Sequence, residues 1–327
     1  MKLATLRNGE RDGRLVVVSA DGRTCIDASA AAPTLLHALE HWGTAKPVLQ
    51  ALSSAVNASG TAGVTPFDGS ECMAPLPRTW QWLDGSAFLN HGHLMERAFK
   101  VPPVADFDTI PLMYQGAADD FLGPHDDVAL PSEADQIDCE GEFGVVLDET
   151  PMGVSPEQAL HHVRLIVLIN DWSLRAMGPR EAKSGFGFVQ AKPSTAFAPI
   201  AVTPDELGPA WRAGRVHLRL QTLRNGEWLG HPQGGAMHFH FGQLIAHAAR
   251  TRKLSAGTVI GSGTVSNADA GAGSSCIAER RMVEALAEGA PRTPFLRFGD
   301  VVQMEALYDR GEPAPFGALR QKVVRQG

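Results

Sequence analysis

The sequence predicts a β-rich α+β protein with a small N-terminal α+β domain at residues 1–75 and a larger domain at residues 76–327. Three observations support this class. The length of 327 residues exceeds that of a typical single domain. Short strand-like runs dominate without alternating regularly with helices, which disfavours a doubly wound sheet. The stretch Pro-Leu-Pro-Arg at 75–78 cannot lie inside a helix and marks the boundary.

Strands followed by a helical segment are expected in the first domain. A strand-like run at 14–18 lies between two Asx-Gly turn signals. Residues 35–52 carry apolar side chains at helical spacing, and Gly43 and Pro47 are expected to split this helix in two.

Short strands continue through the second domain, and two helical patterns at 155–162 and 242–252 interrupt them. Residues 216–221 alternate apolar and polar side chains and lead to Asn225-Gly226, the pattern of a half-buried strand entering a hairpin. The sequence has no G-x-S-x-G, no G-x-G-x-x-G, no Walker A loop and no H-E-x-x-H. These absences disfavour α/β-hydrolases, the common nucleotide-binding folds and zinc proteases.

Composition narrows the setting of the protein. The chain is 44% hydrophobic and 20% charged, as in ordinary globular proteins, and its net charge is -7 with scattered basic residues. No stretch approaches the roughly 20 apolar residues that span a bilayer, and the N-terminus lacks a signal-peptide pattern. We therefore expect a cytoplasmic protein that binds neither nucleic acid nor membrane. Four widely spaced cysteines are expected to be reduced thiols: Cys25, Cys72, Cys139 and Cys276.

Three carboxylates at strand-like runs carry the strongest functional signal. Glu140 and Glu142 lie two apart in the run 137–147, so both side chains are expected on one face, where like charges need a cation or a proton. Asp171 follows the apolar run 163–169. Such a set suits Mg²⁺, Mn²⁺ or Ca²⁺ better than zinc. The alternative is an exposed strand face for the glutamates and a cap for the aspartate.

Four motifs in this order resemble the fumarylacetoacetate hydrolase family: E-G-E-F-G-V-V-L at 140–147, N-D-W-S at 170–173, Lys192, and G-S-G-T-V-S at 261–266. The resemblance covers most of the chain after about Leu83. It implies a mixed β-roll, β-sandwich-like catalytic domain and a homodimer. It also implies that Glu140, Glu142 and Asp171 hold a divalent cation, Mg²⁺ or alternatively Mn²⁺ or Ca²⁺.

The resemblance also indicates a general base. His91 suits this role because the pKa of histidine lies near working pH. His93, which has Glu96 three residues later, competes with it and is otherwise expected to contact substrate. Members that cleave fumarylacetoacetate carry an aspartate ligand shortly before the histidine. Asp84 stands seven residues before His91. It is either a fourth ligand, or the site uses three carboxylates and water.

Other site residues follow from the same resemblance. Lys192 is expected beside the metal, where its ammonium stabilises oxyanion charge. Tyr114, in the segment P-x-x-Y-x-G at 111–116, and Thr264 are expected to contact substrate. Glu279 is expected to assist the histidine or the substrate.

Family members act on 2-oxo or 1,3-dicarbonyl acids through a metal-stabilised enolate. The resemblance therefore implies a hydrolase that cleaves a C–C bond in a diketo acid, fumarylacetoacetate or an acylpyruvate, in aromatic or tyrosine catabolism. One alternative is a 2-oxo-acid lyase or isomerase on the same scaffold, such as an oxaloacetate decarboxylase, a hydratase or a dehydratase. The other is a non-catalytic binding protein that kept the fold.

Overall fold

A long mixed sheet runs through the molecule. The computed structural model describes residues 1–99 and 104–327. Eleven strands of this described part form the larger sheet, and β12 (Ala196–Phe197) pairs with β10 beside the main path. The order along the path is β4 (Val64–Pro66), β3 (Thr24–Asp27), β2 (Arg14–Val18), β1 (Lys2–Leu6), β13 (Ala201–Val202), β10 (Val163–Asn170), β9 (Gly141–Leu147), β18 (Val259–Gly261), β5 (Trp82–Gly85) and β6 (Met113–Gly116).

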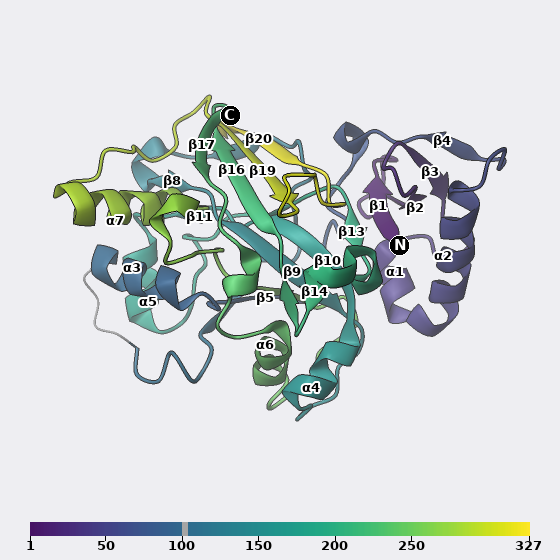
Figure 1. The fold of residues 1–327 in the computed structure, drawn as a ribbon, viewed down its shortest axis with the longest axis horizontal. Coiled ribbons are helices and arrows are strands. Elements are labelled where there is room, and N and C mark those ends of the chain that lie inside the picture. The colour runs from purple at the N-terminus through teal and green to yellow at the C-terminus, as the bar shows by residue number, and fades with distance from the viewer. Residues whose placement is uncertain (100–103) are drawn as a thin grey trace.

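A second, smaller sheet crosses the first in Figure 1. Its order is β17 (Glu227–Gly230), β16 (Arg219–Arg224), β19 (Val301–Leu307), β20 (Leu319–Arg325) and β7 (Val128–Leu130). Two short antiparallel pairs complete the strands of the described residues: β8 (Ile137–Asp138) with β11 (Ser173–Leu174), and β14 (Trp211–Arg212) with β15 (Arg215–Val216). The β-rich α+β class predicted from the sequence is confirmed.

The helices gather in three places (Figure 1). Two lie beside the N-terminal strands: α1 (Leu35–Glu40) and α2 (Trp42–Val56). Three lie at the opposite end of the molecule: α3 (Leu89–Phe99), α5 (Gly178–Ser184) and α7 (Ile277–Glu288). Two more lie along a third side: α4 (Pro156–Ala159) and α6 (Phe241–Ala248). None of the helices in the described ranges is long and apolar enough to cross a membrane.

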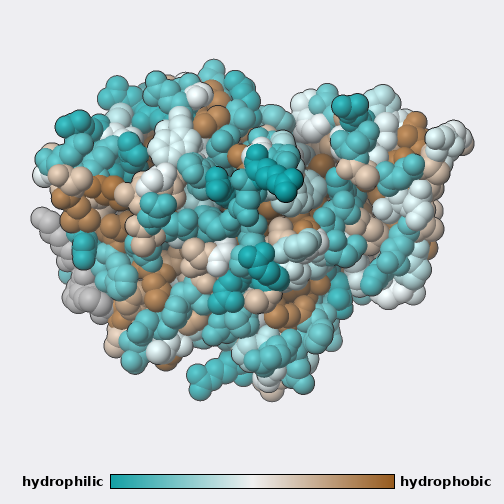
Figure 2. Space-filling view, viewed as in Figure 1, coloured by the Kyte–Doolittle hydropathy of each residue, from teal (hydrophilic) through white to brown (hydrophobic). Residues whose placement is uncertain are grey.

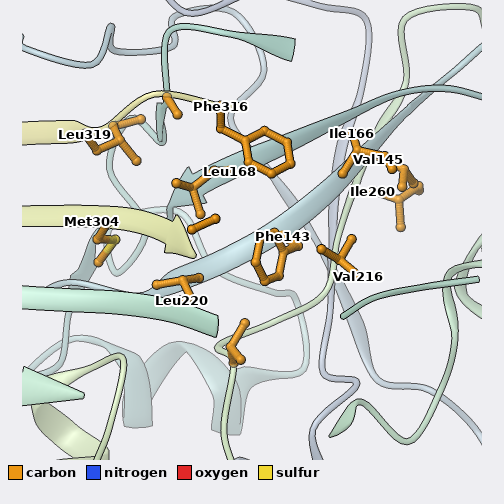
Figure 3. Close-up of a cluster of buried hydrophobic side chains, with 14 of the residues drawn as sticks. Phe143, Val145, Ile166, Leu168, Val216, Leu220, Ile260, Met304, Phe316 and Leu319 are labelled. Carbon is orange, nitrogen blue, oxygen red and sulfur yellow. The ribbon is translucent and has the colours of Figure 1, made fainter. Parts of the chain in front are cut away.

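The strands β9 and β10 are covered on both faces. Because successive residues of a strand point to opposite sides, Phe143 and Leu168 pack toward the smaller sheet, where Figure 3 shows them near Leu220 and Met304. The alternate residues of the two strands, such as Val167, face a second core that includes side chains of the N-terminal helices. This double burial explains the nearly continuous apolar runs. It also means that a carboxylate on these strands is removed from water.

The N-terminal segment is joined to the rest through the larger sheet. Strand β1 pairs with β2 on one side and with β13 on the other, so that Leu3 lies opposite both Val17 and Ala201. Figure 2 shows this segment as a smaller lobe beside a larger one. The division between residues 75 and 76 stays a prediction.

The predicted turn at Asn225-Gly226 is confirmed, whereas the helix predicted at 35–52 divides at another residue than expected. Asn225 and Gly226 both have positive φ, as a two-residue hairpin turn requires. Helix α2, however, contains Pro47 without interruption, and the break falls at His41 instead. The proline stands in the second turn of α2, so only one backbone hydrogen bond is lost there. Burial of side chains such as Leu49 offsets that loss.

We expect Phe143→Ala to lower the free energy of unfolding by about 3–5 kcal/mol, because it leaves a cavity in the core between the sheets. Denaturant unfolding measures this change. The matched control is Phe186→Ala, whose ring is 98% exposed, and it should change stability by less than about 0.5 kcal/mol. Similar effects of the two substitutions would contradict the packing described here.

Candidate active site

Three buried carboxylates meet where the ends of β5, β9 and β10 come together in the larger sheet. Asp84 lies in β5, Glu142 in β9, and Asp171 directly after β10, and their ligand oxygens all lie within 4.8 Å of one another. Antiparallel pairing sets Ile169 of β10 opposite Glu142, while β18 joins β9 to β5. The carboxyl ends of β5, β10 and β18 therefore meet the start of β9.

A glycine keeps the space between these strands open. Gly261 of β18 lies opposite Gly144 of β9 and opposite Asp84 of β5. A Cβ at Gly261 would come within 2.3 Å of Asp84 Oδ1 and 2.4 Å of the Trp82 ring. Asp84 Oδ1 also accepts a hydrogen bond from the Gly263 amide at 3.0 Å. Glycine at position 261 therefore leaves the room that the Asp84 carboxylate occupies.

Among the described residues, Asp84 and Glu142 have no basic side chain paired with them, whereas Asp171 is paired with Lys192. Both oxygens of Glu142 are buried and have no hydrogen-bond partner among the described residues. Burial and the carboxylates of Asp84 and Asp171 raise the pKa of Glu142 well above its usual range. Burial and Asp171 likewise raise the pKa of Asp84 to about 8. Buried carboxylates of this kind require a proton or a cation. Three converging oxygens fit a hard divalent cation held by Asp84, Glu142 and Asp171.

Glu140 lies beside this cluster but is bonded differently. The predicted continuous strand 137–147 breaks at Cys139 and Glu140, between β8 and β9. Lys192 Nζ donates to Glu140 Oε1 at 2.6 Å, Arg175 Nη1 lies 3.2 Å from the same oxygen, and the hydroxyls of Ser173 and Thr264 also donate to this carboxylate. Burial opposes its ionisation, but Arg175 and Lys192 hold the pKa of Glu140 well below its usual range. A ligand role for Glu140 stays a prediction.

Asp171 is oriented by three donors. Lys192 Nζ donates to Oδ2 at 2.5 Å, Tyr114 Oη donates to Oδ2 at 2.6 Å, and Thr195 Oγ1 donates to Oδ1 at 2.7 Å. Burial opposes the charge of Lys192, but Asp171 and Glu140 raise the pKa of its ammonium above the ordinary value. The lysine therefore lies charged beside the candidate cation site, where the sequence predicted it. In this arrangement Tyr114 orders a carboxylate, and its contact with substrate stays a prediction, as does that of Thr264.

A partly buried histidine is paired with a buried glutamate, close enough to Glu140 that the histidine helps to lower the pKa of that carboxyl. His91 in α3 and Glu279 in α7 have side chains 12% and 2% exposed, and Nδ1 lies 2.9 Å from Oε2. With Nδ1–H donating to the carboxylate, Nε2 keeps its lone pair, as a general base requires. His93 instead has a side chain 57% exposed, with Nδ1 3.9 Å from Glu96. The geometry favours His91 over His93 as the base.

Asp138 and Arg175 were not identified from the sequence. The Asp138 carboxylate accepts hydrogen bonds from the amides of Ile277 and Ala278 at 2.7 and 2.9 Å, which satisfies the first turn of α7. It also accepts from Arg175 Nε at 2.8 Å. Because Arg175 also contacts Glu140, Asp138 and Arg175 together connect Glu140 to the helix that carries Glu279. The signal was present in the sequence as D-x-E-x-E at 138–142, with a carboxylate at every second residue.

Comparison with protein-family models decides the relationship. A model described as the fumarylacetoacetate (FAA) hydrolase C-terminal region matches residues 81–324, and one described as fumarylacetoacetase N-terminal domain 2 matches residues 1–78. The chain belongs to the fumarylacetoacetate hydrolase family. The family resemblance inferred from the motifs is therefore confirmed.

Individual relatives within the family differ in activity. The chain is similar to a 2,4-didehydro-3-deoxy-L-rhamnonate hydrolase of Sphingomonas sp. (strain SKA58), with 31% identity over 175 residues, 53% of this chain and 56% of that protein. It is also similar to a mitochondrial oxaloacetate tautomerase of Homo sapiens, with 27% identity over 205 residues, 62% of this chain and 60% of that protein. The chain thus spans little more than half the length of these curated relatives.

Solved structures of family members share the fold along the whole chain. Maleylpyruvate hydrolase from Sphingobium sp. SYK-6, in complex with manganese(II) and pyruvate, has a TM-score of 0.66 and 16% identity and covers 100% of both chains. Fumarylacetoacetate hydrolase from Exiguobacterium antarcticum has a TM-score of 0.66 and 20% identity and covers 99% of both.

The substitution Glu142→Gln should raise the melting temperature without metal and should remove the stabilisation that bound metal gives. Without metal it removes the cost of the proton that Glu142 must take up to stay buried among acids, so the melting temperature at neutral pH should rise by a few degrees, which corresponds to roughly 1 kcal/mol. With Mn²⁺ at about 100 times its Kd, the wild type should gain about 2.7 kcal/mol, and the variant should gain almost nothing. Thermal unfolding with and without Mn²⁺ measures both effects.

Glu305→Gln is the matched control, because burial also raises the pKa of Glu305 but this residue lies outside the carboxylate cluster. It should keep the full response to Mn²⁺. A normal Mn²⁺ response in Glu142→Gln would show that the three carboxylates do not hold the cation.

Proposed function

We propose that this fumarylacetoacetate hydrolase family member is a metal-dependent hydrolase that cleaves a C–C bond in an acylpyruvate-type diketo acid. The buried His91–Glu279 pair carries the proposal. A cation site stabilises an enolate, but forming and protonating that enolate also needs a group that carries the proton. Hydrolytic cleavage needs a base that activates water, and the pair provides one close enough to Glu140 that His91 helps to lower the pKa of this carboxyl.

The residues of the chain support each step of this reaction. Glu279 holds Nδ1 of His91, so that Nε2 takes a proton from water. The hydroxide attacks the acyl carbonyl carbon, and the ammonium of Lys192 stabilises the negative charge that develops on the acyl oxygen. The C–C bond then breaks, and its electron pair leaves with the pyruvate carbon. The proton held by His91 moves to that carbon, which yields a carboxylic acid and pyruvate.

Asp84, Glu142 and Asp171 would hold the divalent cation, with Glu140 and its cations beside them. When bound, the cation polarises the oxygens of the 2-oxo acid and so stabilises the enolate that departs. Mg²⁺ and Mn²⁺ both suit the ligand set, and a related maleylpyruvate hydrolase was solved with manganese(II) and pyruvate. A cytoplasmic homodimer that acts in aromatic or tyrosine breakdown belongs to the same proposal and rests on the family resemblance.

A tautomerase or another isomerase or lyase of 2-oxo acids is the second candidate. The similarity to an oxaloacetate tautomerase favours it. This chemistry uses the carboxylates and the lysine but does not need activated water. The hydrogen-bonded histidine can carry a proton in either reaction, so the products formed distinguish the two candidates; the pair disfavours a binding protein without catalysis.

Purified protein with Mn²⁺ or Mg²⁺ should convert acetylpyruvate or fumarylpyruvate to pyruvate, and excess chelator should abolish the reaction. Proton NMR identifies the products. Tautomerisation or decarboxylation of oxaloacetate, with no cleavage of any acylpyruvate, would move the protein to the second candidate. A protein that binds no divalent cation and converts none of these acids would support the non-catalytic alternative.

His91→Gln should lower kcat for acylpyruvate cleavage by about 10²–10⁴-fold, because the base that activates water is lost. Its affinities for Mn²⁺ and for oxalate, which mimics the enolate of pyruvate, should be unchanged. His93→Gln is the control and should retain kcat, since its side chain is 57% exposed. If His93→Gln loses activity and His91→Gln does not, the assignment of the base is reversed.

A further inference from the structure

A small pocket adjoins the carboxylate cluster on the side of α5. It has a volume of about 100 Å³ and lies between Lys192 and Arg175 on one side and α5 on the other. Among the described residues, this cavity combines catalytic groups with an apolar wall. The part of a substrate that fits this pocket helps to determine which substrate the site accepts.

The polar side of the pocket retains one unused donor. Lys192 Nζ is bonded to Glu140 and Asp171. Arg175 uses Nε for Asp138 and Nη1 for Glu140, but its Nη2 is buried and has no partner among the described residues. The Arg175 side chain is only 10% exposed. A buried donor without a partner beside the pocket can bond an oxygen of the substrate, such as the acyl oxygen, while the apolar wall contacts carbon atoms.

The remaining wall is mostly apolar. It includes Leu174, then Pro179 and Ala182 of α5, and Phe188 and Ala191 from the segment that follows, together with Ser173 and Gly178. The Phe188 ring makes an edge contact with Tyr114, with centroids 5.3 Å apart. Because Tyr114 donates to Asp171, the apolar wall is anchored to the cation site.

The charges around the pocket disfavour a second anionic group. The only cationic side chains that line it, within the described part of the chain, are Lys192 and Arg175, and both are already paired with carboxylates. The positive charges of a bound divalent cation, Lys192 and Arg175 together would not exceed the negative charges of the nearby acids. Those acids are Asp84, Asp138, Glu140, Glu142 and Asp171. A carboxylate in the apolar pocket would find only Arg175 Nη2 as an unpaired donor among the described residues, and most of its surface would be desolvated beside nearby acids, which is unfavourable.

We propose that this pocket binds a short uncharged alkyl chain on the acyl group of the substrate, and that Ala182 sets its length. This inference rests on the proposed hydrolase function. A cavity of about 150 Å³ can hold benzene, so a pocket of this smaller size suits roughly two to four carbons. The preferred substrate is then a monocarboxylate such as butanoylpyruvate, and not a dicarboxylate such as fumarylpyruvate.

The test compares kcat/KM for acetylpyruvate, butanoylpyruvate and fumarylpyruvate with Mn²⁺ present. In the wild type, butanoylpyruvate should exceed fumarylpyruvate by about tenfold or more. Ala182→Phe fills the pocket and should lower kcat/KM for butanoylpyruvate by about tenfold. Lys183→Phe adds the same ring to the same helix away from the pocket, and it should leave all three substrates unchanged.

A second variant keeps the test decisive if Ala182→Phe folds poorly. Ala182→Lys places a cation at an exposed helix position beside the pocket and should raise kcat/KM for fumarylpyruvate about tenfold. A wild type that prefers fumarylpyruvate, or Ala182 variants with unchanged substrate ratios, would overturn the pocket assignment and leave the hydrolase function intact. Failure of the wild type to cleave any acylpyruvate would overturn the function and, with it, this inference.

Discussion

Mutual repulsion among Asp84, Glu142 and Asp171 is the constraint on which the rest of the structure depends. Three carboxylates within 4.8 Å of one another, away from water, do not assemble spontaneously. The register of the larger sheet brings them together, and the apolar side chains on both faces of β9 and β10 hold that register. Packing energy is thus used to keep an otherwise unfavourable group of charges in place. A divalent cation relieves the repulsion.

The charges around this group are arranged so that only the cation position is left uncompensated. Glu140 and Asp138 are each bonded to several donors, and Lys192 and Arg175 connect them to Asp171 and to the start of α7. Buried ion pairs of this kind contribute little net stability. Their main effect here is positional: they fix one ammonium beside the cation site and tie the helix of Glu279 to the strands. The unpaired oxygens of Glu142 stand out against these bonded neighbours.

Much of this arrangement could be predicted from the sequence, because its signals are local. The strand-like runs, the Asn225-Gly226 turn and the motifs around Glu142 and Asp171 each depend on residues close together in the chain. The features that could not be predicted depend on contacts between residues far apart in the chain. Asp84 joins the cluster through the pairing of β5 with β18, about 180 residues later, and its flanking residues give no local signal. Thr195 and Arg175 act through side-chain contacts that no periodicity reports. Glu140 was assigned to a regular strand, but the strand breaks there.

The two halves of the site are carried by different parts of the fold. Glu142 in β9, Asp84 in β5 and Asp171 just after β10 form the carboxylate half, whereas the His91–Glu279 pair is supplied by the helices α3 and α7. In the proposed mechanism, substitutions of His91 or Glu279 would change the activation of water and leave the strands that carry the three carboxylates in place. A gene with this layout can diverge from hydrolysis to isomerisation, or back, by changes confined to two short segments. The separation gives a physical route by which paralogues on one scaffold acquire different reactions.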